Sequence, residues 1–331
     1  MNEFSSANFA LTNKVKTIDE RHMVGQGTLL RSILFATLAH AAALTTVPVR
    51  RVGPLSMVAT SSSVATAVAA DRVAVDRYVA TNRFRVKQGR EAAFEKRWAD
   101  RSSRLGLLDG FRFFCMMRRT DRGAGASAYE DDINYISCTV WERFEAFDAW
   151  KRGDAFKEAH GGGTIGGIAS MLIATAQNTK GKPKAAMWEG LLPMSMAPSS
   201  APTADGWREV VADGRTTLDG DCFIAMNRFS VNAGSEALFE ARFASRESTL
   251  STFDGFKGFV LLRRDGKDDD GFTHSTWSVW RDRSAFEKWR DSEKPAGKSK
   301  AAPEPPMNLY ARPPVPTFYE GILMLESADG I

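Results

Sequence analysis

Three residues in this sequence have side chains suited to holding a flat ligand: Asn82, Trp150 and His160. The imidazole of His160 can ligate a metal ion or carry a proton, and it is one of 4 histidines in the chain. Trp150 offers a broad apolar ring, and Asn82 offers an amide that both donates and accepts hydrogen bonds. We therefore expect these groups to line one pocket that takes a flat ligand edge-on.

The elements that carry these residues follow from the local pattern. Segment 142–160 is predicted to form one helix, which the consecutive glycines 161–163 end. Trp150 and His160 are 10 residues apart, which is about 15 Å along a continuous helix at about 1.5 Å per residue. They would flank one side of that helix without touching, while Asn82 would project from the first strand.

Each of the three residues also has a purely structural interpretation. His160 could cap the carboxyl end of its helix, where the helix dipole favours a cation. Trp150 could be a core tryptophan and Asn82 a structural amide, because both recur elsewhere in the chain as Trp289 and Asn227. Spacing alone leaves these alternatives open.

An internal repeat organises the chain. Asn82-Arg83-Phe84 recurs as Asn227-Arg228-Phe229, 145 positions later, and Asp109-Gly110-Phe111 recurs as Asp254-Gly255-Phe256 at the same offset. After a loop that is shorter in the second copy, Val140-Trp141 pairs with Val279-Trp280 and Trp150 with Trp289 at an offset of 139. Residues 77–194 and 221–327 are therefore predicted to be two copies of one unit.

The pattern of each copy predicts the order β-α-β-β-α-β, which is the ferredoxin-like arrangement of an α+β fold. In the first copy we expect strands at 78–86, 111–118, 133–141 and 185–194, with a short extra helix at 164–176. Two helices cover one face of such a sheet, so the other face needs a partner. We expect the tandem copies, joined by a linker at 195–220, to form an intramolecular dimeric α+β barrel, a monomeric pseudo-dimer.

The two copies differ at the histidine. The position 10 residues beyond Trp289 is Ser299, and Pro295 and Gly297 are predicted to end the helix before it. His274 lies on a predicted strand, where we interpret it as structural. The second copy is therefore predicted to be a degenerate, structural scaffold, and only the first copy is expected to hold a site.

These motifs resemble those of the antibiotic-biosynthesis-monooxygenase superfamily, and most of all its IsdG-type heme-degrading monooxygenases. The resemblance rests on N-R-F in the first strand, G-x-E-x-x-F-E, D-G-F, and the block from Val140-Trp141 through Phe147, Trp150 and Phe156 to Ala159-His160. It covers both copies, and the block from Trp141 to His160 is its most specific part.

The resemblance implies a role for each residue. His160 matches the axial ligand of the heme iron, Asn82 the amide on the distal side, and Trp150 the indole that buckles the porphyrin, while Phe156 falls in the same heme-binding block. Heme would be both substrate and cofactor, and it would be cleaved with O₂ and release of iron. No flavin or nicotinamide fingerprint is found, so the electrons would come from an external donor such as ferredoxin or a reductase.

Other functions remain open at this point. The same histidine would serve a heme-binding carrier or sensor that does not turn heme over. Other members of the superfamily are cofactor-free oxygenases of aromatic substrates, and a stress protein that has the fold but does not use it for catalysis is a further alternative.

The formal charge of +4 comes without a long basic run, so no nucleic-acid partner is expected. The charges on the first helix, Arg90, Glu91, Glu95, Lys96 and Arg97, are typical of a solvated face.

Residues 1–76 are predicted to be a disordered targeting leader. Residues 33–44 form an apolar run of 12, too short for a membrane span of roughly 20 residues, and the alanines at its end suit a signal-peptide cleavage site. Residues 44–70 contain no acid, as in transit peptides. The two parts together resemble the bipartite leader of proteins sent to the chloroplast, with Met1 or Met23 as the start; mitochondrion and secretion are the alternatives. No membrane span is expected in the mature protein.

Overall fold

The computed structural model describes residues 71–101, 104–120, 132–160, 162, 164–195, 210–246, 248–266, 270–293 and 309–327. All of them belong to one compact unit, residues 67–331. The predicted leader lies outside the described residues except for 71–76, and Ser299 lies outside them too. The domain boundaries, the leader and its destination stay predictions.

The first copy contains four strands and four helices in its described part. The strands are β1 (Arg77–Phe84), β2 (Phe111–Arg119), β3 (Tyr135–Trp141) and β4 (Lys184–Ser195). The helices are α2 (Glu91–Ala99), α3 (Phe144–Arg152), α4 (Asp154–Ala159) and α5 (Ile165–Asn178). The four expected strands and the extra helix are confirmed, whereas the single helix predicted at 142–160 is wrong, because two helices meet there at Gly153.

The second copy repeats this order with fewer helices. Its strands are β5 (Cys222–Val231), β6 (Phe256–Asp265), β7 (His274–Trp280) and β8 (Tyr310–Glu326). Its α-helices in the described residues are α6 (Glu236–Ala244) and α7 (Arg283–Ser292). Helix α7 thus ends before position 299, and the residues equivalent to α4 lie outside the described part of the chain.

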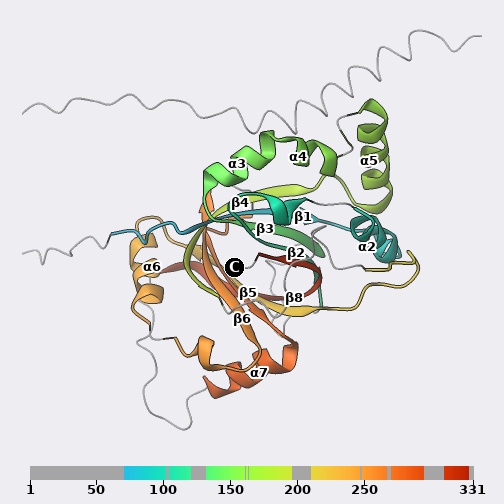
Figure 1. Ribbon diagram of the computed structural model, residues 1–331. Coiled ribbons are helices and arrows are strands. Elements are labelled where there is room, and N and C mark those ends of the chain that lie inside the picture. The colour runs from blue at the N-terminus through green and yellow to red at the C-terminus, as the bar shows by residue number, and fades with distance from the viewer. Residues whose placement is uncertain are drawn as a thin grey trace, which may run out of the picture. The chain divides into compact units, whose positions relative to one another are not determined.

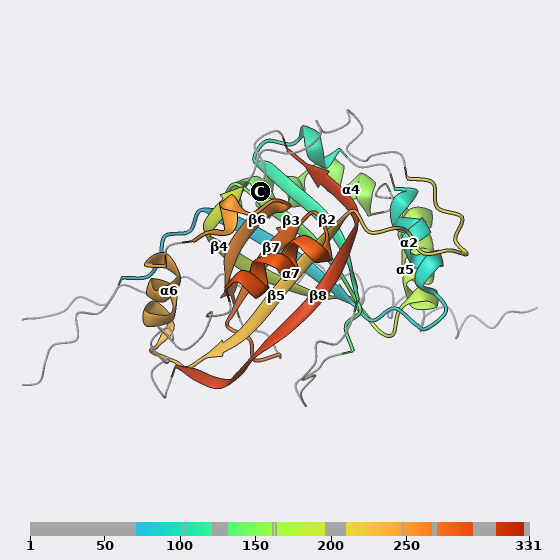
Figure 2. The same ribbon diagram turned by 90° about the horizontal axis from the view of Figure 1, so that it is seen from below.

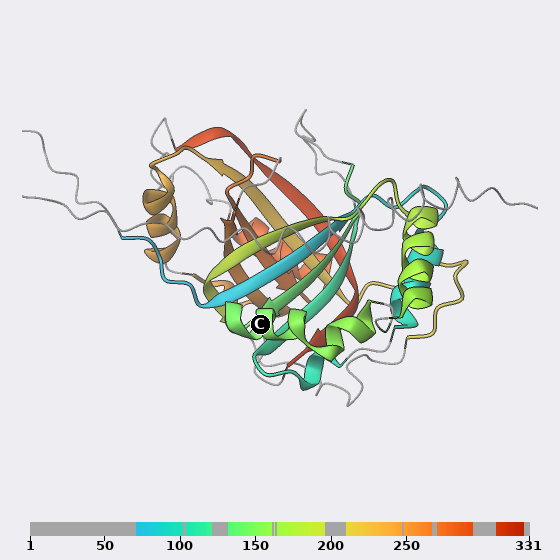
Figure 3. The same cartoon turned by 90° about the horizontal axis from the view of Figure 1, so that it is seen from above.

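The strands close into one antiparallel barrel in the order β1-β3-β2-β8-β5-β7-β6-β4 (Figure 1). The last strand of each copy joins it to the other copy: β4 pairs with both β1 and β6, and β8 pairs with both β5 and β2. The predicted intramolecular α+β barrel is confirmed. Viewed from below and from above, the helices lie outside the barrel wall (Figures 2 and 3).

Strand alternation divides the side chains between the barrel interior and its outer wall. On β1, Val79 belongs to the interior cluster, whereas Tyr78, Ala80 and Phe84 belong to the cluster under the helices of the first copy. The three cysteines of the chain are free and buried in the interior cluster. Since apolar side chains fill the barrel, the outer wall is where a ligand and the helices can meet.

Two buried glutamates tie the copies together. Glu95 on α2 accepts a hydrogen bond from the backbone nitrogen of Leu218 at 2.5 Å, and Glu240 on α6 accepts one from the nitrogen of Val73 at 2.9 Å. Val73 and Leu218 lie at equivalent positions of the repeat, 145 residues apart. The segment that leads into each copy is therefore held by the other copy, and residues 71–76 are part of the packed unit.

None of the helices in the described residues is both long enough and apolar enough to cross a lipid bilayer.

Candidate functional site

His160 lies at the carboxyl end of α4 with its ring fixed by two contacts. Its Nδ1 lies 2.7 Å from the carbonyl oxygen of Phe156, and its ring stacks on the Phe156 ring at 4.0 Å between centroids. A carbonyl oxygen only accepts hydrogen bonds, so Nδ1 carries the proton and Nε2 keeps its lone pair. Nε2 has no hydrogen-bond partner within the described residues.

The electrostatic surroundings of His160 favour the neutral ring. Burial lowers its pKa, the hydrogen bond to Phe156 opposes this effect, and the nearby charge of Arg101 lowers the pKa further. A neutral imidazole with one nitrogen tied to a carbonyl is the arrangement that metal-ligating histidines use. The Nδ1 hydrogen bond caps the end of α4, but the neutral ring does not carry the positive charge that the capping interpretation assumed, and Nε2 stays available.

Gly153 sets the angle at which α4 leaves α3. Its backbone is extended, with φ −81° and ψ 171°, which ends one helix and starts the next. Phe156 then reaches back to Trp150, and their rings meet edge to face at 5.0 Å. Trp150 and His160 therefore do not lie on one straight helix, and Phe156 contacts the rings of both.

Trp150 is partly buried against the outer wall of the barrel. Its ring lies 5.3 Å from that of Trp141 and 5.8 Å from that of Phe147. Trp289 makes the same contact with Trp280 at 5.4 Å in the second copy. The interpretation of Trp150 as a core residue thus holds for the part of its ring that packs on Trp141.

Asn82 is the exposed residue of an otherwise largely buried strand. It lies on the outer face of β1 together with Phe84, between Ser137 of β3 and Ala185 of β4. Its amide makes no hydrogen bond within the described residues. Asn82, Trp150 and His160 therefore share the helix-covered side of the first copy, although no described contact joins Asn82 to the other two.

Helix α2 and the residues just after it contribute two arginines that the sequence analysis did not assign to the site: Arg97 lies in α2, and Arg101 lies two residues beyond its end. Arg101 lies over the Trp98 ring at 4.3 Å and donates a hydrogen bond to the carbonyl oxygen of Ala159, the residue before His160. Arg97 donates to the carbonyl oxygen of Met171 at 3.2 Å. Neither has a carboxylate partner within the described residues. Burial lowers the pKa of Arg101 to about 10, and the charge of Arg97 adds to this effect.

The expectation of a solvated charged face on this helix is wrong for its central residue. Glu95 is fully buried, and it accepts hydrogen bonds from Tyr135 at 2.6 Å and from Arg118 at 3.0 Å. The sequence feature that could have marked Glu95 and Arg101 was the repeat, since Glu95 recurs as Glu240 and Arg101 as Arg246.

The second copy uses the equivalent positions differently. Helix α7 ends at Ser292, and its Trp289 is followed by no described aromatic residue in place of Phe156. His274 is buried, and its Nε2 lies 3.2 Å from Glu240, where it occupies the place that Tyr135 takes beside Glu95. The structural interpretation of His274 agrees with these contacts.

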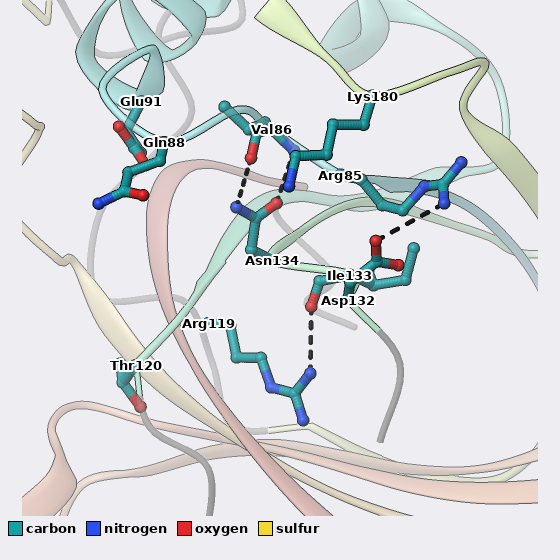
Figure 4. Close-up of a pocket in the computed structure, with 10 residues that line it drawn as sticks. All are labelled: Arg85, Val86, Gln88, Glu91, Arg119, Thr120, Asp132, Ile133, Asn134 and Lys180. Carbon is teal, nitrogen blue, oxygen red and sulfur yellow. Dashed lines mark hydrogen bonds and ion pairs between the residues drawn. The ribbon is translucent and has the colours of Figure 1, made fainter. Parts of the chain in front are cut away.

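A pocket of about 330 Å³ lies away from these residues, at the end of β1 (Figure 4). Its wall includes Arg85, Arg119, Asn134 and Lys180, and none of Asn82, Trp150, Phe156 or His160. This pocket is therefore a separate feature from the site predicted from the sequence.

Comparison with known proteins identifies the family. The profile of the antibiotic biosynthesis monooxygenases matches residues 77–162 and 222–295, one segment in each copy. A heme oxygenase of Staphylococcus haemolyticus, described as staphylobilin-producing, is 32% identical over 83 residues, which are 25% of this chain and 72% of that protein.

The solved structures to which the chain is similar are far more distant in sequence. An inferred monooxygenase of Fusobacterium nucleatum subsp. nucleatum is 9% identical with a TM-score of 0.47, and covers 76% of this chain and 95% of its own. One from Lactobacillus acidophilus is 7% identical with a TM-score of 0.46, and covers 76% of this chain and 96% of its own. With a family profile in each half and a relative matched over most of its length, the chain belongs to the antibiotic biosynthesis monooxygenase family.

Proposed function

We propose that this protein is a heme-degrading monooxygenase with a single site, in its first copy. The observation that carries the proposal is the hydrogen bond of His160. Its Nδ1–H donates to the carbonyl oxygen of Phe156, which leaves Nε2 as the unprotonated nitrogen that can ligate a metal. Burial lowers the pKa of this ring, so at neutral pH it is ready to ligate iron without first losing a proton.

The surrounding residues fit a flat, anionic ligand. Trp150 and Phe156 offer apolar surface beside His160. Arg97 and Arg101 are partly buried cations without a carboxylate partner in the described residues, and heme carries two carboxylates. A buried charge is costly unless it is paired. A ligand that brings carboxylates to this side of α2 would remove that cost.

Each residue then has a defined task. His160 would hold the iron, Phe156 would fix the plane of the imidazole, and Arg97 and Arg101 would bind the carboxylates. Asn82, with its unbonded amide on the barrel wall, would donate a hydrogen bond on the opposite face of the ligand. Trp150 would press on the macrocycle. When bound, heme supplies both the iron that activates O₂ and the carbon skeleton that is oxidised, and an external donor supplies the electrons.

The test is a hemin titration of the full chain followed by reduction in air. A Soret band that forms and then decays with release of iron supports the enzyme. A stable Soret band instead indicates a carrier or sensor, and no band in the wild type contradicts both and leaves the cofactor-free oxygenase. His160→Ala should abolish tight binding, whereas Ser299→Ala, at the equivalent position of the second copy, should not. Equal effects of the two changes would overturn the single-site assignment.

A further inference from the structure

Two turns of the first copy are joined by hydrogen bonds at the end of β1. The turn from β1 to α2 meets the turn from α5 to β4 through Lys87 N to Asn178 O at 2.8 Å and Lys180 N to Arg85 O at 2.7 Å. A bridge between Val86 and Thr179 lies between these bonds. The two turns therefore present one continuous surface.

That surface is strongly basic. The first turn carries Arg85, Lys87 and Arg90, and the second carries Lys180, Lys182 and Lys184. The three lysines of the second turn are exposed. The acids beside them are Glu91 and Asp132, and Asp132 lies 3.6 Å from Arg85. Among the described residues of the two turns and the pocket wall, basic side chains outnumber acidic ones, and we call the six basic residues the basic turn pair.

The second copy lacks the charges of the first turn, although Arg312 of β8 donates to Ser230 at 2.7 Å there. At the positions equivalent to Arg85, Lys87 and Arg90 it has Ser230, Asn232 and Ser235, all uncharged. The backbone is nevertheless the same, since Gly89 and Gly234 both adopt positive φ in these turns. In the first copy Lys87 donates to the carbonyl oxygen of Ala176 at 2.7 Å and Arg90 to the side chain of Asn178 at 3.2 Å, both at the end of α5. These cations therefore occur together with α5, on the copy that carries His160.

The pocket of about 330 Å³ opens into this surface (Figure 4). Arg85 and Lys180 line it from the two turns, and Arg119 lines it from the end of β2. The Arg119 guanidinium donates to the carbonyl oxygen of Ile133 at 3.2 Å. A pocket of this size with cations on its walls suits an acidic side chain inserted by a partner.

We propose that the basic turn pair is the docking surface for an acidic electron-donor protein. The inference rests on the proposed function, which requires electrons from outside the chain. Arg85 directly follows β1 and is three residues beyond Asn82, so the surface begins about 10 Å from Asn82 at about 3.3 Å per residue. In each encounter the one-electron centre of the donor is oxidised and ferric heme is reduced; no bond is formed or broken.

The charge of the patch makes the docking testable without heme. The probe is an oxidised plant-type [2Fe–2S] ferredoxin, titrated into the heme-free full chain by calorimetry at an ionic strength of about 0.02 M, where screening is weak. We expect Lys180→Glu combined with Lys182→Glu to weaken binding by about tenfold or more. The matched control, Lys288→Glu with Arg290→Glu on α7 of the second copy, should bind as the wild type does.

A second measurement follows turnover of the heme-loaded protein. With ferredoxin and its reductase, the Lys180→Glu, Lys182→Glu variant should need about tenfold more donor for half-maximal rate, and added salt should shrink the difference. With ascorbate as the reductant the variant should match the wild type, because a small molecule does not need the surface.

The outcomes separate the two proposals. If ferredoxin does not bind the wild type, or binds the lysine variant equally well, the docking surface is overturned. If binding depends on the lysines but heme is never degraded, the docking stands and the proposed function fails. If the lysines instead bind vesicles of phosphatidylglycerol while ferredoxin does not bind, the surface recognises lipid and the proposal is wrong.

Discussion

The Nδ1 nitrogen of His160 lies 2.7 Å from the carbonyl oxygen of Phe156, four residues earlier in the chain. This one contact fixes which nitrogen carries the proton, and with the stacked ring of Phe156 it fixes the plane of the imidazole. The capping role and the ligand role of His160 therefore do not compete. The hydrogen bond at Nδ1 leaves Nε2 as the nitrogen that can ligate a metal.

The first prediction concerns the pH dependence of hemin affinity. Burial lowers the pKa of His160 below its ordinary value of about 6.5. Ligation needs the neutral ring, which exists above the pKa, so affinity should stay constant from about pH 8 to below 6.5. Below the pKa of His160 it should fall about tenfold per pH unit. Soret titrations at a series of pH values measure this, and a midpoint above 6.5 would contradict it.

The second prediction concerns the carboxylates of the ligand. Arg101→Gln removes a partly buried cation, and we expect hemin affinity to fall about tenfold, or about 1.4 kcal/mol. Affinity for hemin dimethyl ester, which has no free carboxylates, should change little. Arg104→Gln is the control, because Arg104 is exposed on the surface and paired with Glu158 at 2.8 Å. An equal loss for both ligands would show that Arg101 acts through packing on Trp98 instead.

The third prediction uses the internal repeat as its own control. Asn82 and Asn227 are both exposed on equivalent strands. Asn82→Ala should leave hemin binding within about twofold but slow the decay of the Soret band about tenfold or more, as expected for a lost hydrogen bond of about 1.4 kcal/mol in the transition state. Asn227→Ala should leave both quantities unchanged. A slower rate in both variants would mean that the second copy also takes part.

The fourth prediction concerns stability rather than the site. Gly110 has φ +70°, and a Cβ there would lie 2.7 Å from the Cβ of Ala146 on α3. Gly110→Ala should therefore lower the free energy of unfolding by about 2–4 kcal/mol, from the left-handed backbone and the clash together. Gly89 has φ +76° but nothing within 4 Å, so Gly89→Ala should cost only about 1–2 kcal/mol. Denaturant titrations check the order, and equal losses would remove the steric argument.

The sequence predicted the repeat and the strands because each copy alternates apolar and polar residues between turn signals. It also predicted the barrel, since a sheet with one covered face needs a partner. It missed the helix break at Gly153, although Arg152-Gly153-Asp154 carries a helix stop followed by an acidic helix start. Apolar residues recur on both sides of Gly153, and this pattern favoured one continuous helix over the local stop.

The arginines of the site could not be identified in the same way. Helix α2 has charged residues at four of its 9 positions, and only tertiary packing decides which of them lose water. Arg97 is half-covered because it bonds to Met171 and Thr175 of α5, a helix whose place beside α2 no short-range pattern gives. The basic turn pair could not be identified for the same reason, since its two halves are at least 90 residues apart along the chain.

The last strand of each copy also pairs with a strand of the other copy, and this has a consequence for synthesis of the chain. When the first copy has left the ribosome, the outer edges of β2 and β4 still lack their neighbours β8 and β6. Exposed strand edges invite pairing with other chains. The barrel can close only when β8, at the far end of the sequence, enters between β2 and β5. Nascent chains should therefore depend on chaperones until translation ends.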